Sequence, residues 1–339
     1  MDHYFKGITR ATIICTILGF LISGSLIGFN IRTEPVLPKA QIILSEDSLQ
    51  LDTLQFFHRT SLAYDSNRVA SVVENNTEIG ASHFFFHFNP EFLVWVVLVT
   101  IMMSISLGIS PLLLDRLYYL QSWFKVQKST LWGIVAVGAG FGLVFLLLLV
   151  KNPYLYTYTD WIGYLEILVE HTWVLQVVIA VPTITGLIAL VGMIFISKSI
   201  DQLKPDKAHT FKEQFTLLNN SLRFFLLVST TLITFAVFTS GALRKAIMQE
   251  VVAKGIDMIP IEFVYLYGLQ FSIVLAIFYL PIYYQLRNRA QKYLSSVDDD
   301  EAHPGISAFM NESISDSLKI ALSILAPLIS GFLPDMIHF

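Results

Sequence analysis

The chain has 339 residues, of which 54% are hydrophobic and only 14% are charged, and its formal net charge is −4. About a quarter of the residues of a typical soluble domain are charged, so this balance indicates a membrane protein, and the small net charge gives no reason to expect a nucleic-acid partner. The one cysteine, Cys15, lies in an apolar run, which excludes a disulfide framework and a cysteine metal site.

The N-terminal apolar run, residues 11–31, follows the two cations Lys6 and Arg10. This run is longer than the apolar core of a signal peptide, and residues 30–33 do not form a small-x-small cleavage site. We therefore predict that residues 1–31 form an uncleaved signal-anchor helix.

Six apolar segments are each long enough to cross a bilayer. They cover residues 11–31, 91–114, 130–150, 172–197, 223–243 and 263–284. The last two lie in a helical hairpin expected over about residues 211–245 and 262–294, which extends past the membrane on one side. The predicted fold is an all-α polytopic integral membrane protein of six transmembrane helices, five of them in a bundle over residues 91–294.

Most lysines and arginines near the ends of these segments fall on one side of the predicted membrane. They are Lys6, Arg10, Arg116, Lys125, Lys128, Lys198, Lys204, Lys207, Lys212, Arg223, Arg287, Arg289 and Lys292. Because cytoplasmic loops are enriched in Lys and Arg, we expect both termini to be cytoplasmic, in a multi-pass protein of the bacterial inner (plasma) membrane.

Residues 32–90 are expected to form a small extracytoplasmic domain between the first two spans, with short strand-like runs. His83 and His87 are four residues apart, and His171 begins the fourth span on the same side. Imidazoles placed in this way could bind a metal or haem, or could sense pH. They are equally typical of ordinary interfacial histidines, so the sequence implies no definite cofactor.

Two pairs of glycines have the four-residue spacing that lets membrane helices approach closely. They are Gly24 and Gly28 in the first span, and Gly138 and Gly142 in the third. The spacing favours packing within the chain, and a contact in a homo-oligomer is the alternative.

Polar residues inside the later spans suggest where a ligand or a pore could lie. Pro182 interrupts the fourth span a turn and a half after Gln176, and such a break is either a structural kink or a binding point. The fifth span carries the hydroxyl residues Thr230, Thr231 and Thr234, and the sixth carries Gln270. These could line a polar seam, or simply hydrogen-bond between helices.

The remaining segments lie on the basic side. Lys198, Lys204, Lys207 and Lys212 form a basic loop suited to a cytoplasmic protein partner or to anionic lipid headgroups. Residues 295–312, with four consecutive carboxylates, are expected to be an acidic, solvated linker. Residues 313–339 are predicted to form a short apolar helix that lies in the membrane interface or self-associates.

No phosphate loop, nucleophile elbow, zincin or dinucleotide motif is present, and no Asp, Glu, Lys or Arg lies in the middle of a predicted span. The latter observation argues against ion-coupled transport, which uses an ionisable group at membrane depth. The first hypothesis is therefore a non-enzymatic membrane sensor or effector that acts through helix packing or oligomer assembly, with a pore as one form. The alternatives are a small-molecule or lipid transporter with a midplane site near Pro182, and a metal- or haem-dependent protein using the outer histidines.

Overall fold

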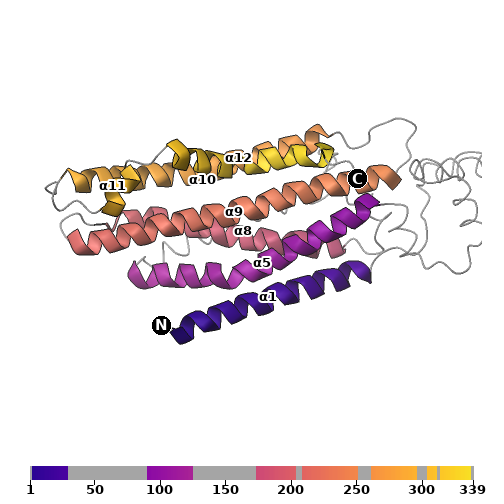
Figure 1. Ribbon diagram of the computed structural model, residues 1–339, viewed down its shortest axis with the longest axis horizontal. Coiled ribbons are helices and arrows are strands. Elements are labelled where there is room, and N and C mark those ends of the chain that lie inside the picture. Colours follow the sequence, from indigo (N-terminus) through magenta and orange to yellow (C-terminus); the bar gives the residue numbers. More distant parts are fainter. Residues whose placement is uncertain are drawn as a thin grey trace, which may run out of the picture.

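The computed structural model describes residues 2–29, 90–124, 173–203, 208–250, 261–295, 304–310 and 314–336. The regular elements in these ranges are all helices: α1 (Asp2–Gly28), α5 (Pro90–Trp123), α8 (Trp173–Ile200), α9 (Ala208–Glu250), α10 (Glu262–Leu294), α11 (Pro304–Met310) and α12 (Ile314–Met336) (Figure 1). Five of them are long and apolar enough to cross a membrane, and α12 contains a shorter apolar stretch. This confirms the all-helical, polytopic fold. The predicted third span and residues 32–89 lie outside the described ranges.

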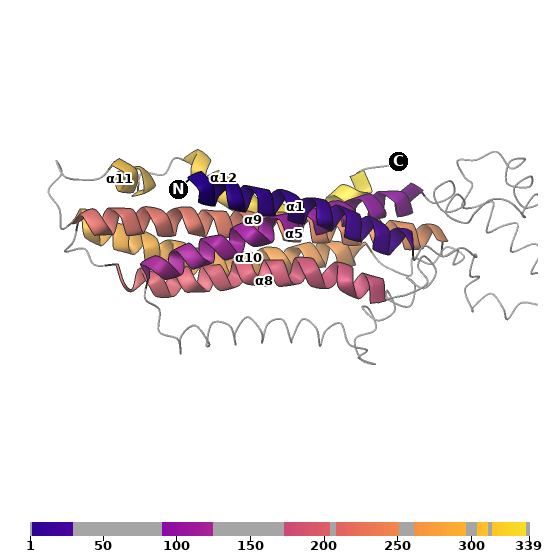
Figure 2. The ribbon, with the colours of Figure 1, turned by 90° about the horizontal axis from the view of Figure 1, so that it is seen from below.

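Helix α9 is the centre of the described bundle. It packs against α5, α8, α10 and α12, while α1 contacts mainly α5 at one edge (Figures 1 and 2). The buried side chains form two apolar clusters along this axis. One lies between the α5 start and the α9 end, around Phe92, Trp95 and Ala246. The larger one surrounds the first two thirds of α9 and includes Phe225 and Tyr279.

The predicted start of the second span is confirmed. Helix α5 begins at Pro90, and Glu91 lies in its first turn. Proline suits this position because the first N–H groups of a helix have no intrahelical acceptor, and a carboxylate stabilises the positive end of the helix dipole. The Glu91 carboxylate also pairs with Lys245 Nζ of α9 at 3.9 Å, which joins the two helices at this end.

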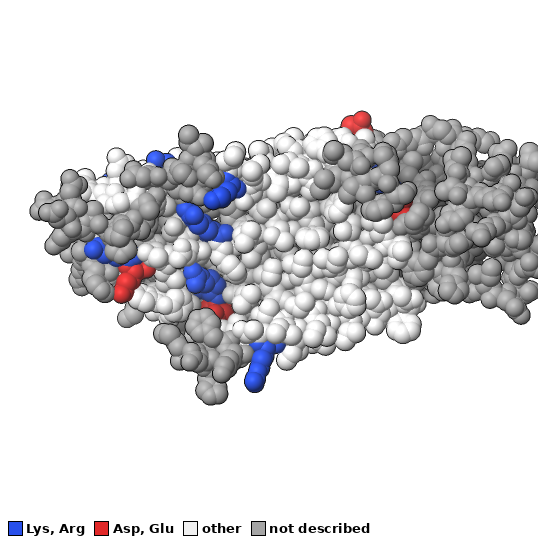
Figure 3. Space-filling model, in the orientation of Figure 1, with Lys and Arg blue, Asp and Glu red and all other residues white. Residues whose placement is uncertain are grey.

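On the face shown in Figure 3, the charged side chains of the described residues lie towards the two ends of the bundle, with a broad uncharged belt between them. In α9 the belt is residues 224–243, about 30 Å of helix at 1.5 Å per residue, which matches the hydrocarbon core of a bilayer at about 30 Å. One edge of the belt carries a cation from each of six helices, and we name this set the basic rim: Arg10, Arg116, Lys198, Arg223, Arg287 and Lys319. The bundle end beyond the rim is called the basic end.

Helix α12 does not lie apart from the bundle, as an interfacial helix would. It packs along α9 and α10 and runs away from the basic end, so that Phe332 stacks on Tyr265 in the first turn of α10 at 4.3 Å. Helix α1 starts at the basic end, because its last turn carries Ile27 into the cluster around Phe92. The last described turn of α12 and the first turn of α1 therefore lie at opposite ends of the bundle (Figure 1).

Part of the predicted acidic linker is an ordered, packed helix. In α11, Ile306 and Phe309 are buried against the ends of α9 and α10 that extend beyond the basic rim. Phe309 lies edge-on to Phe215 at 5.3 Å and beside Tyr283 at 5.5 Å. The prediction of a linker rested on the run of four carboxylates. Ile306 and Phe309, which lie one helical turn apart, hold α11 against the bundle by their burial.

Candidate functional site

The strongest candidate site is the contact between α12 and the α9–α10 hairpin, which we call the α12 seam. It is formed by Thr230, Gly268 and Ser272 on the hairpin and by Ser323 and Pro327 on α12. A Cβ atom built on Gly268 would lie 2.5 Å from the Pro327 carbonyl oxygen and 3.1 Å from Leu328 Cα. Only glycine allows the two backbones to come so close, which is how helices commonly associate inside a membrane.

The seam also repairs a break in α12. Pro327 has no N–H, so the carbonyl of Ser323, four residues earlier, loses its intrahelical donor. The Thr230 hydroxyl of α9 donates a hydrogen bond to this carbonyl at 3.0 Å. An unpaired carbonyl in hydrocarbon is costly, so the proline in one helix and the threonine in another complement each other.

A second polar contact joins α12 to α10. The Leu328 backbone N–H lies 3.3 Å from the Ser272 hydroxyl, and the Ser330 hydroxyl donates to the Pro327 carbonyl at 2.7 Å. Ser272 and Ser330 are both almost completely buried. The α12 seam is therefore formed by small and polar residues, although it lies at the depth of the uncharged belt.

The opposite face of α12 carries its large apolar side chains. These exposed residues are Leu318, Leu322, Leu325 and Ile329. A helix with small and polar residues facing inward and leucines facing outward suits lipid surroundings. An interfacial helix has the reverse arrangement, with its polar face in water. Helix α12 packs on the bundle beside the uncharged belt.

Thr230→Val should weaken the α12 seam without changing its shape. The variant leaves the Ser323 carbonyl unpaired, and interhelical hydrogen bonds in membrane proteins are worth about 0.6 kcal/mol on average and up to about 1.7 kcal/mol. We expect a loss of that size in unfolding free energy, measured by thermal or denaturant unfolding in detergent. Thr231→Val is the matched control, because among the described residues the Thr231 hydroxyl bonds to the Leu227 carbonyl of its own helix and to no other helix. Equal losses would contradict the role given to Thr230.

Thr234 and Gln270, the other predicted pore or ligand residues of the hairpin, do not take part in the α12 seam. Thr234 has a buried hydroxyl with no hydrogen-bond partner among the described residues. Gln270 is exposed on the outside of α10. Hydrogen bonding between helices, the second of the two readings of the sequence, thus accounts for Thr230.

The Pro182 break is a buried part of α8, and hydroxyls next to it bond back to the backbone. Thr183 donates to the Ile179 carbonyl at 2.7 Å, and Thr185 donates to the Val181 carbonyl at 3.0 Å. Gln176 is exposed and lies away from this buried face. Thr185 also contacts α5, where its hydroxyl oxygen lies 3.2 Å from Ser110 Oγ and 3.4 Å from the Ser106 carbonyl oxygen, so this face of α8 packs against α5.

The close approach between α1 and α5 occurs at different residues from the predicted glycines. No described atom lies within 4 Å of a Cβ built on Gly24 or Gly28, whereas a Cβ on Gly19 would lie 2.8 Å from Ser104 Cα. Ser23 and Thr100 continue this contact with their hydroxyl oxygens 3.4 Å apart. Gly138 and Gly142 lie outside the described residues.

The sequence contained a signal for this missed contact. Gly19 and Ser23 are four residues apart in α1, and Ser104 and Gly108 are four residues apart in α5. Serine is also small enough for close helix packing. Mixed glycine–serine pairs at this spacing therefore mark the faces on which α1 and α5 meet.

The predicted metal residues His83, His87 and His171 lie outside the described ranges, as do Lys204 and Lys207 of the basic loop. Within the ranges that the structure covers, no three His, Cys, Asp or Glu residues are placed to hold a metal ion. Lys198 is exposed in the last turn of α8, and Lys212 is half-buried in the first turns of α9.

These features define the class: a polytopic, all-helical membrane protein with a shorter apolar helix packed along a central hairpin. No family model matches the chain, and comparison with curated proteins and with solved structures finds no match. The function has therefore to be argued from the contacts themselves.

Proposed function

We propose that the chain is a non-enzymatic membrane sensor or effector whose output depends on whether α12 is packed against the α9–α10 hairpin. The observation that carries this proposal is the α12 seam. Lipid tails are as apolar as leucine, so no hydrophobic driving force holds one membrane helix against another. Close packing at Gly268 and two hydrogen bonds, from Thr230 and to Ser272, supply the attraction instead.

Such a contact can be shifted by a modest change in free energy. A ligand, lipid or partner that prefers one arrangement of α12 needs a differential affinity of only a few kcal/mol to change the populations. Helix α11 connects the seam to the basic end, because Phe309 and Ile306 are buried against the extensions of α9 and α10. We take the basic end as cytoplasmic, which makes α11 the natural place for a cytoplasmic signal to act.

The test is to compare locked and released forms of α12. Tyr265→Cys and Phe332→Cys, in a Cys15→Ala background, place two thiols where two rings stack, and a disulfide between them would fasten α12 to α10. Ionic current across bilayers and oligomeric mass are measured for the oxidised form, the reduced form and a deletion of residues 313–339. We expect the locked and deleted forms to differ in current or in mass.

The oxidised and reduced forms are the same polypeptide, so this comparison stays informative if the deletion variant does not fold. A pore would appear as discrete conductance that changes on locking. A scaffold or sensor would appear as a change of assembly without current. Identical current and identical mass in the oxidised and reduced forms would rule out the proposal.

A further inference from the structure

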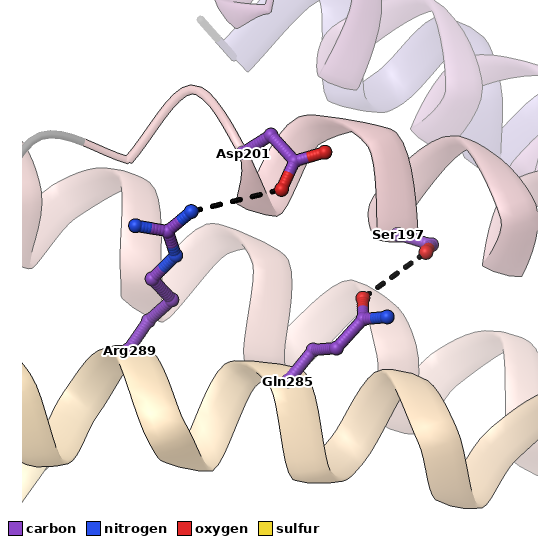
Figure 4. Close-up of polar contacts among 4 residues, drawn as sticks. All are labelled: Ser197, Asp201, Gln285 and Arg289. Carbon is purple, nitrogen blue, oxygen red and sulfur yellow. Dashed lines mark hydrogen bonds and ion pairs between the residues drawn. The ribbon is translucent and has the colours of Figure 1, made fainter.

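A ladder of polar contacts holds the end of α8 beside α10 at the basic end (Figure 4). Ser197 donates to the Gln285 side-chain oxygen at 3.2 Å. One turn further, Arg289 Nη2 lies 3.6 Å from Asp201 Oδ1. Because the partners are four residues apart on each helix, both contacts lie on one line between the two helices.

The charges at this corner remain accessible. The Arg289 and Asp201 side chains are 33% and 75% exposed, and an ion pair with that exposure is weak because water screens it. Lys198 follows Ser197 directly and is also exposed. A guanidinium and an ammonium on neighbouring helices suit phosphate oxygens, the guanidinium through paired N–H donors and the ammonium as a compact charge.

The depth of the corner identifies the source of phosphate. It lies at the edge of the uncharged belt, where lipid headgroups would meet the protein. Exposed aromatic side chains occur at the same end: Tyr118, Tyr119 and Trp123 on α5 and Tyr284 on α10. Tyr and Trp are enriched at membrane–water interfaces because one part of the ring system is apolar and the other polar. These observations favour a lipid headgroup over a soluble phosphate compound.

We propose that the corner formed by Lys198, Gln285 and Arg289 binds the headgroup phosphate of an anionic phospholipid. The Gln285 amide N–H₂ is available as a donor, because its oxygen accepts from Ser197. Asp201 competes with the phosphate for Arg289. The site would be formed by α8 and α10 alone, so it holds whether or not α12 moves.

The experiment is a titration of the purified full-length protein with phosphatidylglycerol in phosphatidylcholine vesicles or nanodiscs, with bound lipid counted by native mass spectrometry. Lys198→Gln and Arg289→Gln should each weaken binding about fivefold, the factor that corresponds to about 1 kcal/mol per basic residue near an anionic surface. Asp201→Asn should strengthen it, because the competing carboxylate is removed. Arg244→Gln, at the opposite end of α9, is the matched control and should leave binding unchanged.

Three results would overturn the proposal. The first is equal retention of phosphatidylglycerol and phosphatidylcholine. The second is the same loss in Arg244→Gln as in the two corner variants, which would mean a general charge effect. The third is full displacement of the lipid by glycerol phosphate at similar concentration, which would identify a soluble phosphate ligand. None of these outcomes depends on locking or deleting α12, so they are distinguishable from a failure of the proposed function.

Discussion

Replacing Gly268 by leucine is expected to separate α12 from the hairpin. The obstacle to a larger side chain is the Pro327 carbonyl oxygen, 2.5 Å from the position of a Cβ atom, and backbone cannot move aside as a flexible side chain can. Overpacking of this kind typically costs about 1–3 kcal/mol. Separation of the helices would also break the hydrogen bonds from Thr230 and to Ser272. We therefore expect the loss in unfolding free energy to lie at the upper end of that range.

The measurement is the yield of the disulfide between Tyr265→Cys and Phe332→Cys, with and without Gly268→Leu. We expect the yield to fall strongly in the Gly268→Leu variant. Gly186→Leu is the matched control, because a Cβ at Gly186 has no described atom within 4 Å. If Gly268→Leu cross-links as efficiently as its parent, the close approach at the seam is not what holds α12.

The second large effect is expected for Gly19→Leu in α1. A Cβ atom there would lie 2.8 Å from Ser104 Cα and 3.0 Å from the Met103 carbonyl oxygen. Helix α1 would have to move away from α5, which would break the contact between Ser23 and Thr100. We expect the unfolding free energy to fall by about 1–3 kcal/mol.

Gly24→Leu provides an internal control in the same helix. It adds the same side chain where a Cβ would meet open space, so its membrane insertion and helix propensity change in the same way. Thermal unfolding in detergent should then separate the two variants clearly. Equal destabilisation would mean that the effect comes from α1 itself and not from its packing on α5.

The sequence predicted the helices well because length and hydrophobicity determine them one at a time. Pro90 marked the start of α5, and the extended hairpin matches α9 and α10. The sequence could not predict which helix faces pack against each other, because such a contact depends on the residues of both helices. The role of Thr230 follows only when Pro327, 97 positions later in the chain, is placed beside it.

The same limit applies to the C-terminal segment. Its apolar stretch, residues 317–332, is shorter than the roughly 20 residues of a comfortable span. Taken alone, it resembles an interfacial helix. Its placement depends on Gly268, Thr230 and Ser272, which lie on α9 and α10 and not on the segment itself.

The form of α9 has a mechanical consequence. It is a single helix of 43 residues, about 64 Å long at 1.5 Å per residue, with no proline inside it, whereas its neighbours α5, α8, α10 and α12 each contain at least one. A helix of this length without a proline is expected to tilt as one rigid body. A tilt of about 5° displaces one end by about 5 Å relative to the other. A tilt of α9 that displaces Phe215 near the basic end would therefore also displace Lys245, on the far side of the bilayer, because both residues belong to the same helix.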